Sequence, residues 1–235
     1  MARAPRLRRI AWLTDSGGLR YHWRALRHRD QAWRPFRDAV AGWLAAWQPP
    51  CERLVLVGPS AGHTLPIERM HHFAEIIALE PDALARRWLS RRARGRPLRF
   101  ERIDVLRGTA PLRPLAEAFP DAAILFCNVL GQVRPPGGGR WHGPLADQLV
   151  GRHWASYHDV VSTTVRPRAG AAARAFADDP LETVLAHFWP GGELALIDHE
   201  TFRLAGPGHA ADYALWQLTP AHTHLIEWVV HQPPA

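Results

Sequence analysis

The sequence predicts an α/β fold built on a doubly wound, mostly parallel sheet of seven strands. Short apolar runs alternate with helix-compatible stretches from residue 51 onward, which is typical of parallel βαβ units. The first run ends at a glycine turn, where open α/β sheets bind their ligands. Two strand-like runs close the chain and predict an antiparallel hairpin.

The length and composition describe an ordinary globular protein. The 235 residues suffice for one large domain, and 47% of them are hydrophobic against 22% charged. No apolar run approaches the ~20 residues of a membrane span, and the apolar part of the N-terminus is too short for a signal peptide. We therefore expect a cytoplasmic protein with no membrane partner, although mitochondrial presequences share the arginine bias of this N-terminus.

The formal net charge of +7 leaves a nucleic-acid partner open. The positive side chains are arginines spread over residues 3–37 and 86–102, a pattern typical of solvated helix faces, and nucleic acid is therefore not favoured. The two cysteines, Cys51 and Cys127, exclude a disulfide framework and a cysteine-rich zinc site.

Residues 1–50 are expected to form a helical cap ahead of the sheet domain, which takes residues 51–235. Tyr21, Ala25 and Leu26 recur at helical spacing, and a second apolar set does the same from residue 33 to residue 47. The pair Pro49-Pro50 ends this segment. A lid over a ligand and a simple packing layer both fit this pattern.

The elements of the sheet domain follow from the alternation of apolar runs and amphipathic stretches. The expected parallel strands are Leu54–Val57, Glu75–Leu79, Leu98–Ile103, Ala122–Val129 and Glu193–Ile197, and the hairpin pairs Asp212–Leu218 with His224–His231. The expected helices lie over Leu65–Phe73, Ala83–Arg94, Leu145–Trp154 and Asp179–Phe188.

Small residues and acids stand where three of the expected strands end. The turn Gly58–Gly62, with Ser60 at its centre, would let backbone amides approach a ligand closely. Glu80 ends the second expected strand and Asp104 the third. A carboxylate about 20 residues beyond a glycine turn can accept hydrogen bonds from a ribose diol, as in other nucleotide sites.

In this order, the elements from Cys51 to Gln232 resemble a class I S-adenosylmethionine-dependent methyltransferase with a Rossmann-like fold. The run Phe188–Asp198 looks like the Leu-x-Pro-Gly-Gly segment that leads into the family's strand five. The resemblance implies that S-adenosylmethionine is the cofactor. The residues it places on the cofactor side are Gly58, Ser60, Gly62, Glu80 and Asp104.

The glycine turn departs from the family pattern. Ser60 replaces the middle glycine, Pro59 stiffens the turn, and Leu56 stands where the family has an acid that helps bind the methionine end. These departures leave an alternative: a non-catalytic relative whose cofactor binding is altered or lost.

The resemblance also implies an acceptor side. Asn128, in the run Phe126–Gln132, would position the methyl acceptor, and His158 and Asp159 are candidates to remove its proton. Asn128 does not stand in the Asn-Pro-Pro-Tyr context of methyltransferases acting on amino groups of bases or glutamine. A small-molecule acceptor is therefore expected.

The turn also spells G-x-S-x-G, which makes Ser60 a candidate serine-hydrolase nucleophile with Asp198 and His222 or His224 as partners. Only one helical segment precedes this serine, whereas an α/β-hydrolase places several strands and an oxyanion loop first. The histidines show no H-E-x-x-H pattern. His222 and His224 share one face of a strand, but a satisfied or solvent-facing pair is favoured there, and no metal is expected.

Overall fold

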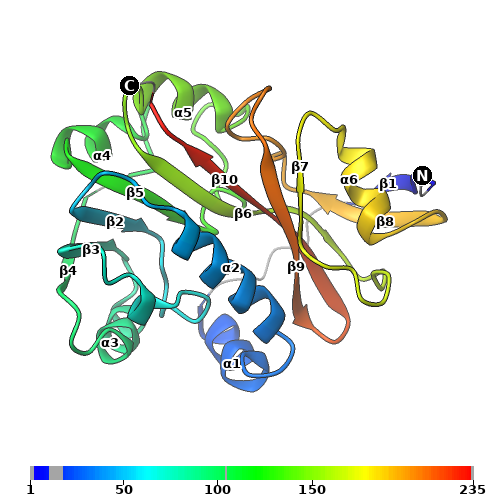
Figure 1. Ribbon diagram of the computed structural model, residues 1–235, viewed down its shortest axis with the longest axis horizontal. Coiled ribbons are helices and arrows are strands. Elements are labelled where there is room, and N and C mark those ends of the chain that lie inside the picture. Colours follow the sequence, from blue (N-terminus) through cyan, green and yellow to red (C-terminus); the bar gives the residue numbers. More distant parts are fainter. Residues whose placement is uncertain (1–2, 11–17, 104, 234–235) are drawn as a thin grey trace.

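One mixed sheet runs through the protein, with helices on both faces (Figure 1). The computed structural model describes residues 3–10, 18–103 and 105–233. Within these ranges the strands are β1 Arg6–Arg9, β2 Arg53–Val57, β3 Glu75–Leu79, β4 Leu98–Glu101, β5 Ala122–Cys127, β6 Trp154–Thr163, β7 Arg174–Phe176, β8 Glu193–Asp198, β9 Ala211–Thr219 and β10 His222–His231. The helices are α1 Gly18–His28, α2 Arg34–Ala46, α3 Ala83–Arg92, α4 Arg113–Ala118, α5 His142–Gln148 and α6 Leu181–Phe188, with a 3₁₀ turn at Ile67–Arg69.

The strands β4, β3, β2, β5 and β6 form the parallel half of the sheet, in that order. Val57 at the end of β2 pairs with Leu79 of β3 and with Phe126 of β5, so these three strands end together. Nearly every residue of the three strands is buried, as expected for parallel strands that are covered on both faces. The sequence predicted four of these five strands.

The other half of the sheet is antiparallel. β10 lies between β6 and β9 and is antiparallel to both, and β7 adds a further strand beside β9. The closing hairpin expected from the sequence is β9 and β10.

The expected strand Glu193–Ile197 forms, but its predicted place as the fifth parallel strand was wrong. The run Glu193–Ile197 lies in β8, which leaves the main path of the sheet, pairs antiparallel with the end of β6 and runs parallel to β1. The fifth parallel strand is β6, in a section expected to be helical and loop. All ten residues of β6 are buried, including polar ones with internal hydrogen bonds, and this mixed composition hides the strand pattern.

Three smaller expectations also differ from the structure. The sheet has ten strands within the described residues rather than seven, because β1, β7 and β8 extend it. The helix expected over Leu65–Phe73 is only the 3₁₀ turn, so no regular helix begins after the glycine turn. The segment expected to be helical throughout, residues 1–50, contains the strand β1, and the helix predicted to reach Trp154 ends at Gln148.

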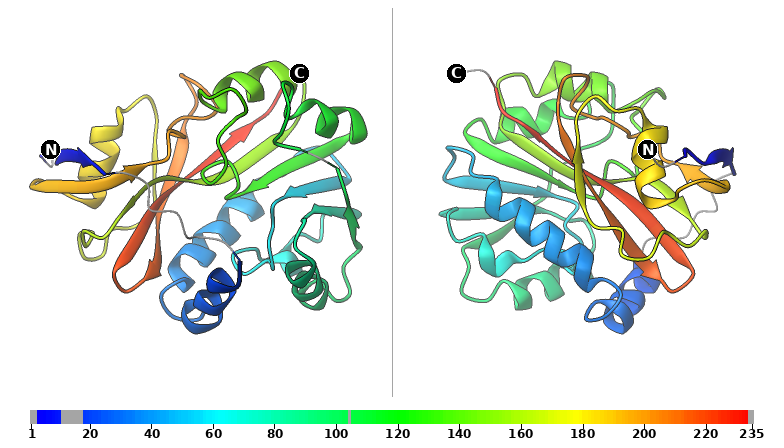
Figure 2. Two further views of the ribbon diagram at one scale, coloured as in Figure 1. Left: turned by 180° about the vertical axis from the view of Figure 1, so that it is seen from behind. Right: turned by 45° about the vertical axis from the view of Figure 1, so that its right-hand side comes forward.

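Helices cover the two faces of the sheet with separate apolar cores. α1, α2 and α3 pack on one face, and α2 crosses the sheet in front of β6 and β9 (Figures 1 and 2). α4 and α5 cover the other face. α6 packs against β8 and the antiparallel strands in a third cluster. No helix in the described ranges is long and apolar enough to cross a membrane.

Aromatic rings join α2 to the sheet. Phe36 is fully buried and stacks on Trp216 of β9 with ring centroids 5.0 Å apart. Trp33, just before α2, meets the same indole edge-on at 4.9 Å and donates its indole N–H to the Leu218 carbonyl at 3.1 Å. These contacts fix the helical segment on the sheet through both packing and one directed hydrogen bond.

We expect Phe36→Ala to lower the free energy of unfolding by about 3–5 kcal/mol, because a buried ring is removed and a cavity remains. Urea unfolding followed by tryptophan fluorescence measures the change. The control is Trp23→Ala on α1, where the side chain is 60% exposed, with an expected change within about 0.5 kcal/mol. Equal losses for the two variants would contradict the packing of α2 described above.

Candidate functional site

A cleft of about 800 Å³ opens where the parallel strands β2, β3, β4 and β5 end. Open α/β sheets bind ligands at this edge, beyond the carboxyl ends of the strands. The lining combines apolar side chains with two acids and three arginines. The lining residues are Val57, Gly58, Leu79, Glu80, Pro81, Arg86, Glu101, Arg102, Ile103, Val105, Leu106, Arg107, Val129 and Val133.

The glycine turn after β2 forms the inner wall of the cleft. Gly58 has a φ of +64°, and a Cβ added there would lie 3.0 Å from the Cβ of Val129. Gly62 has a φ of +65°, and its added Cβ would lie 2.6 Å from Leu89 of α3. Both positions therefore require glycine. Ser60 adopts a φ of +51° between them, which is uncommon for a residue with a side chain.

Glu80 holds the glycine turn in shape. One oxygen of its carboxylate accepts the Ser60 N–H at 2.7 Å, and the other accepts the Asp82 N–H at 3.0 Å. The side chain is 8% exposed and faces the cleft. Burial raises the pKa of the Glu80 carboxyl, while the two N–H donors oppose that rise. Asp104, the other acid expected at the cofactor, lies outside the described residues.

A second, narrower cavity of about 90 Å³ lies on the other side of the turn. Gly58 lines both cavities, so this residue lies between the two spaces. The other residues that line the narrow cavity are Gly18, Tyr21, Pro59, Ser60, Thr64, Cys127, Asn128, Gln132, Tyr157 and Trp216. The start of α1 therefore forms part of its wall, and the hydroxyls of Thr64 and Tyr157 share a hydrogen bond of 2.9 Å within it.

Asn128 reaches the narrow cavity from the end of β5, and its backbone has a φ of +56°. Its amide oxygen accepts the Asp159 N–H at 2.8 Å, and its amide nitrogen donates to the Asp159 carboxylate at 3.3 Å. Burial would raise the pKa of the Asp159 carboxyl, but His224, His199 and the Asn128 amide outweigh it, and that pKa is lowered. The structure thus brings together two of the three residues expected on the acceptor side.

His158 is the third, and it lies apart from both cavities. Side chains alternate along β6, so His158 faces away from Tyr157 and Asp159. It is fully buried, with Nδ1 3.0 Å from the Ser156 hydroxyl and Nε2 3.1 Å from the Thr201 carbonyl. Its ring also lies 3.4 Å from Glu227, which accepts the Tyr213 hydroxyl. These contacts give His158 a role in the core.

The groups of the hydrolase alternative are not assembled. Asp198 pairs with Arg9 at 3.0 Å and accepts the Glu200 N–H at 2.9 Å. His224 pairs with Asp159 at 3.0 Å. Within the described part of the chain, no hydrogen bond joins Ser60, Asp198 and a histidine, so the triad order seen in the sequence has no spatial counterpart.

Sequence reasoning missed several residues around the narrow cavity. Tyr21 was expected only as part of the helical cap, which could be a lid or a packing layer, and Thr64 was not singled out, yet both line the cavity. Tyr157 also lines the cavity and belongs to the strand β6, in a section where no strand was expected. A search of β6 for polar residues two apart would have found Tyr157 and Asp159 on one face.

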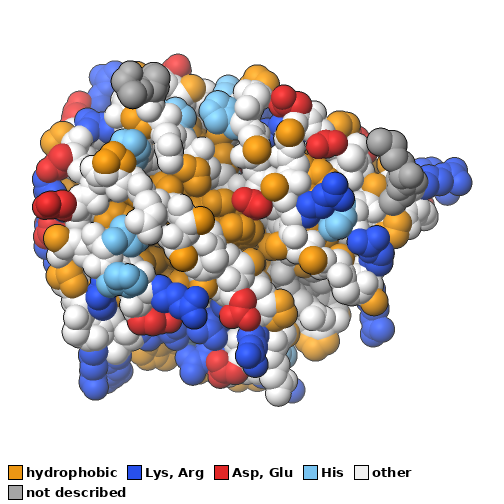
Figure 3. Space-filling model, in the orientation of Figure 1, with side chains coloured by type: hydrophobic (Ala, Val, Ile, Leu, Met, Phe, Trp, Pro, Cys, Tyr) orange, Lys and Arg blue, Asp and Glu red, His pale blue; other side chains and the backbone are white. Residues whose placement is uncertain are grey.

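The surface charges do not form a single basic stripe on the face drawn in Figure 3. Basic and acidic side chains are interspersed there, with hydrophobic ones between them. Several arginines are paired with acids, among them Arg53 with Asp121 and Arg203 with Asp178. This arrangement is that of a solvated surface rather than of a groove for a phosphate backbone.

No family model matches the chain, and no curated protein matches it in sequence. Among solved structures it is similar to N-methyltransferase NodS from Bradyrhizobium japonicum WM9, with 11% identity and a TM-score of 0.46 over 87% of this chain and 99% of that one. It is also similar to a geranyl diphosphate methyltransferase in complex with GPP and sinefungin, with 11% identity and a TM-score of 0.41. This match covers 97% of this chain and 88% of that one.

A SAM-dependent methyltransferase from Thiobacillus denitrificans in complex with S-adenosyl-L-homocysteine gives 14% identity and a TM-score of 0.38. This match covers 62% of the present chain and 57% of the Thiobacillus chain, little more than half of the latter's length. At such identities and TM-scores, these similarities do not by themselves assign an activity to the chain.

Two histidines lie buried together beside the narrow cavity, beneath α1. His22 Nδ1 is 3.3 Å from His63 Nε2, and both side chains are 3% exposed. Burial, with added repulsion from Arg92 and His22, lowers the pKa of His63 to about 3. His63 is therefore neutral in the folded protein at neutral pH, whereas it gains a proton near pH 6.5 when unfolded.

Because the unfolded state binds more protons below pH 6.5, we expect the free energy of unfolding to fall as the pH drops from 6.5 towards 4. His63 contributes up to about 1.4 kcal/mol per pH unit in this window. Urea unfolding at several pH values measures the slope. His63→Gln should flatten the slope, and His209→Gln, at an exposed histidine, should leave it unchanged. A slope that His63→Gln does not alter would contradict a neutral buried His63.

Proposed function

We propose that the protein is an S-adenosylmethionine-dependent methyltransferase acting on a small-molecule acceptor. The observation that carries this proposal is the pair of cavities that share Gly58 in their walls, one large with a carboxylate and one narrow with polar groups. In this proposal residues 51–235 form the methyltransferase domain, and residues 1–50 form a cap whose helix α1 walls the narrow cavity.

The large cleft has the chemistry that an adenosyl group requires. Each oxygen of the Glu80 carboxylate receives one hydrogen bond and has a further lone pair for a ribose hydroxyl. Leu79, Ile103 and Val129 supply apolar contact for the purine ring. The lack of a Cβ at Gly58 lets the glycine turn pack closely against Val129, between the cleft and the narrow cavity. Gly62 supports the turn by packing against α3, and Asp104 is proposed for the adenine side.

When bound, S-adenosylmethionine supplies a methyl group on a positively charged sulfur. The residues of the chain then have to orient the acceptor and exclude water, because an in-line displacement depends chiefly on positioning. Asn128, fixed by Asp159, is placed to bind a hydroxyl or amine of the acceptor, and Tyr21 of α1 helps close the cavity. The cavity of about 90 Å³ favours a small acceptor group over a large one.

The main departure from the family's cofactor-binding pattern is at Leu56. It is fully buried in the core of β2, so no acid stands at the position that the family uses for the methionine end. Ser60, Thr64 and Gln132 are the polar groups that line the narrow cavity instead. If they do not replace that acid, the protein keeps the fold without binding the cofactor, and a binding measurement separates the two cases.

We expect S-adenosylhomocysteine to bind the wild type and Glu80→Gln to weaken binding roughly 10- to 100-fold, because the charge on the hydrogen-bond acceptor is lost. Isothermal titration calorimetry measures the dissociation constant. The matched control is Glu75→Gln at the opposite end of the same strand, which should leave affinity unchanged. A thermal melt of each variant checks that the glycine turn remains folded.

Three outcomes would count against the enzyme. The first is the absence of wild-type binding to both S-adenosylmethionine and S-adenosylhomocysteine, which would favour the non-catalytic relative. The second is equal weakening by the two glutamine variants. The third is binding of NAD⁺ or ADP in their place, since the three arginines of the cleft could bind a phosphate group.

A further inference from the structure

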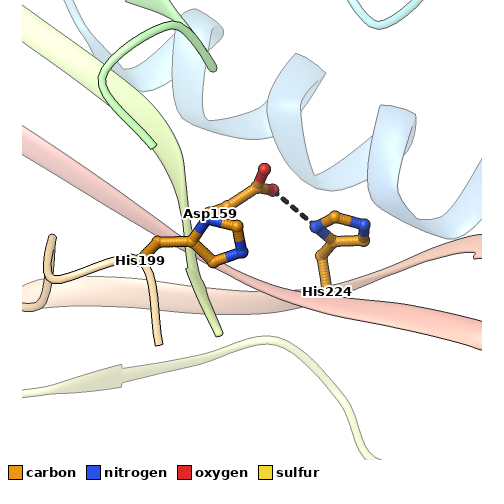
Figure 4. Close-up of side chains that lie close together, drawn as sticks. All are labelled: Asp159, His199 and His224. Atoms are coloured by element: carbon orange, nitrogen blue, oxygen red, sulfur yellow. Dashed lines mark ion pairs between the residues drawn. The ribbon is translucent and has the colours of Figure 1, made fainter. Parts of the chain in front are cut away.

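Two histidines and one aspartate form a buried cluster behind the narrow cavity. His199 follows β8, Asp159 lies in β6 and His224 lies in β10, so the cluster joins three separate segments of the sheet (Figure 4). The exposed fractions are 9% for His199, 2% for Asp159 and 5% for His224. One donor atom from each residue lies within 4.8 Å of the others.

The donor atoms point at a common position. His199 Nε2 lies 2.6 Å from the Ser162 hydroxyl oxygen, and His224 Nδ1 lies 3.0 Å from the same oxygen. His224 Nδ1 is also 3.0 Å from Asp159 Oδ1. Donors around one tetrahedral Zn²⁺ lie roughly 3.3 Å apart at bond lengths of about 2.0–2.1 Å. The pair His224 Nδ1 and Asp159 Oδ1 is close to that spacing, and all three donor atoms lie within 4.8 Å of one another.

Hydrogen bonds outside the cluster orient two of its members. His199 Nδ1 donates to the Gly131 carbonyl at 2.9 Å, because a carbonyl can only accept, and a neutral ring then has its lone pair on Nε2 towards the centre. Asp159 is held through its other oxygen by the Asn128 amide. Such outer contacts are typical of histidine and carboxylate metal ligands.

Buried polar atoms remain unsatisfied in the cluster. Among the described residues, Asp159 Oδ1 accepts no hydrogen bond of good geometry, although it lies in ion-pair range of His224, and His224 Nε2 has no hydrogen-bond partner. No hydrogen bond from these residues to Nε2 therefore fixes the proton of the His224 ring, and a neutral ring can direct the Nδ1 lone pair inward. Buried polar groups without partners are rare, and binding of an ion is one explanation for them.

We propose that Asp159, His199 and His224 bind one divalent first-row transition metal ion, with Zn²⁺ as the best match to the donor set. Two imidazoles and one carboxylate are the protein ligands of several zinc sites, and the Ser162 hydroxyl or a water completes the four. The ion links β6, β10 and the segment after β8, and through Asp159 it fixes Asn128. This inference does not depend on the methyltransferase proposal.

His222 offers an internal control. It lies two residues before His224 on the same strand and its ring stacks on His224 with centroids 4.8 Å apart, but it is not one of the three clustered donors. The sequence placed His222 and His224 on one face of a strand, and no metal was expected there. The structure instead pairs His224 with two residues that are distant in sequence.

The test uses the full chain, stripped with a chelator and then titrated with Zn²⁺ by calorimetry and with Co²⁺ by visible absorption. We expect one Zn²⁺ per chain, ligand-field bands for Co²⁺ at the intensity of a four-coordinate site, and a higher melting temperature with metal. His199→Gln and Asp159→Asn should each weaken binding by about a hundredfold or more, beyond the 10–100-fold typical of outer contacts. His222→Gln should retain wild-type affinity.

The Asp159→Asn variant keeps the shape of the side chain, so it reports on the site even if His199→Gln fails to fold. Near-ultraviolet circular dichroism checks each fold before titration. Retention of tight binding by Asp159→Asn, or its loss in His222→Gln, would overturn the assignment. Absence of stoichiometric Zn²⁺ and Co²⁺ binding by the wild type would also overturn it, and would leave a proton on His224 as the partner of Asp159.

Discussion

The candidate site depends on the register of β2 between its two parallel neighbours. Val57 is aligned with Leu79 on one side and with Phe126 on the other. The chain therefore leaves the sheet at the same edge three times, and this brings the glycine turn, Glu80 and Asn128 together. A slip of two residues in either pairing would keep the apolar side chains buried but would separate these groups by about 7 Å. The apolar core and the site thus share one geometric requirement.

The parallel half of the sheet could be predicted from sequence because its strands are apolar and short. β2, β3 and β5 are short runs of mostly buried apolar residues, followed by a glycine turn, by Glu80 and by Asn128 respectively, and this pattern has few other interpretations. The positions of Gly58 and Glu80 at the cleft follow from it. Their contacts do not, because the bond from the Ser60 N–H to Glu80 depends on how the turn folds after β2 ends.

β6 could not be predicted in the same way. Its buried side chains include His158 and Asp159, whose partners come from the segment after β8, from β10 and from the turn after β5. The order of apolar and polar residues along a segment does not show such distant partners. The sequence of β6 therefore resembled that of a loop. The apolar segment Glu193–Ile197 misled for the opposite reason, since it has the composition of a central strand but lies off the main path of the sheet. The same missing partners explain why the cluster around His224 was not foreseen.

The pairing of β1 with β8 bears on the order in which the protein folds. These strands run parallel from Arg6 to Arg9, and the side chains that join them, Arg8 and Glu193, are 185 residues apart. During synthesis at about 5–20 residues per second, β1 waits roughly 10–40 s before its partner exists. Until β8 is synthesised, β1 has no strand to pair with. When β8 forms, the backbone groups on its outer edge stay unpaired until β1 binds there. β1 is therefore among the last elements to join the sheet.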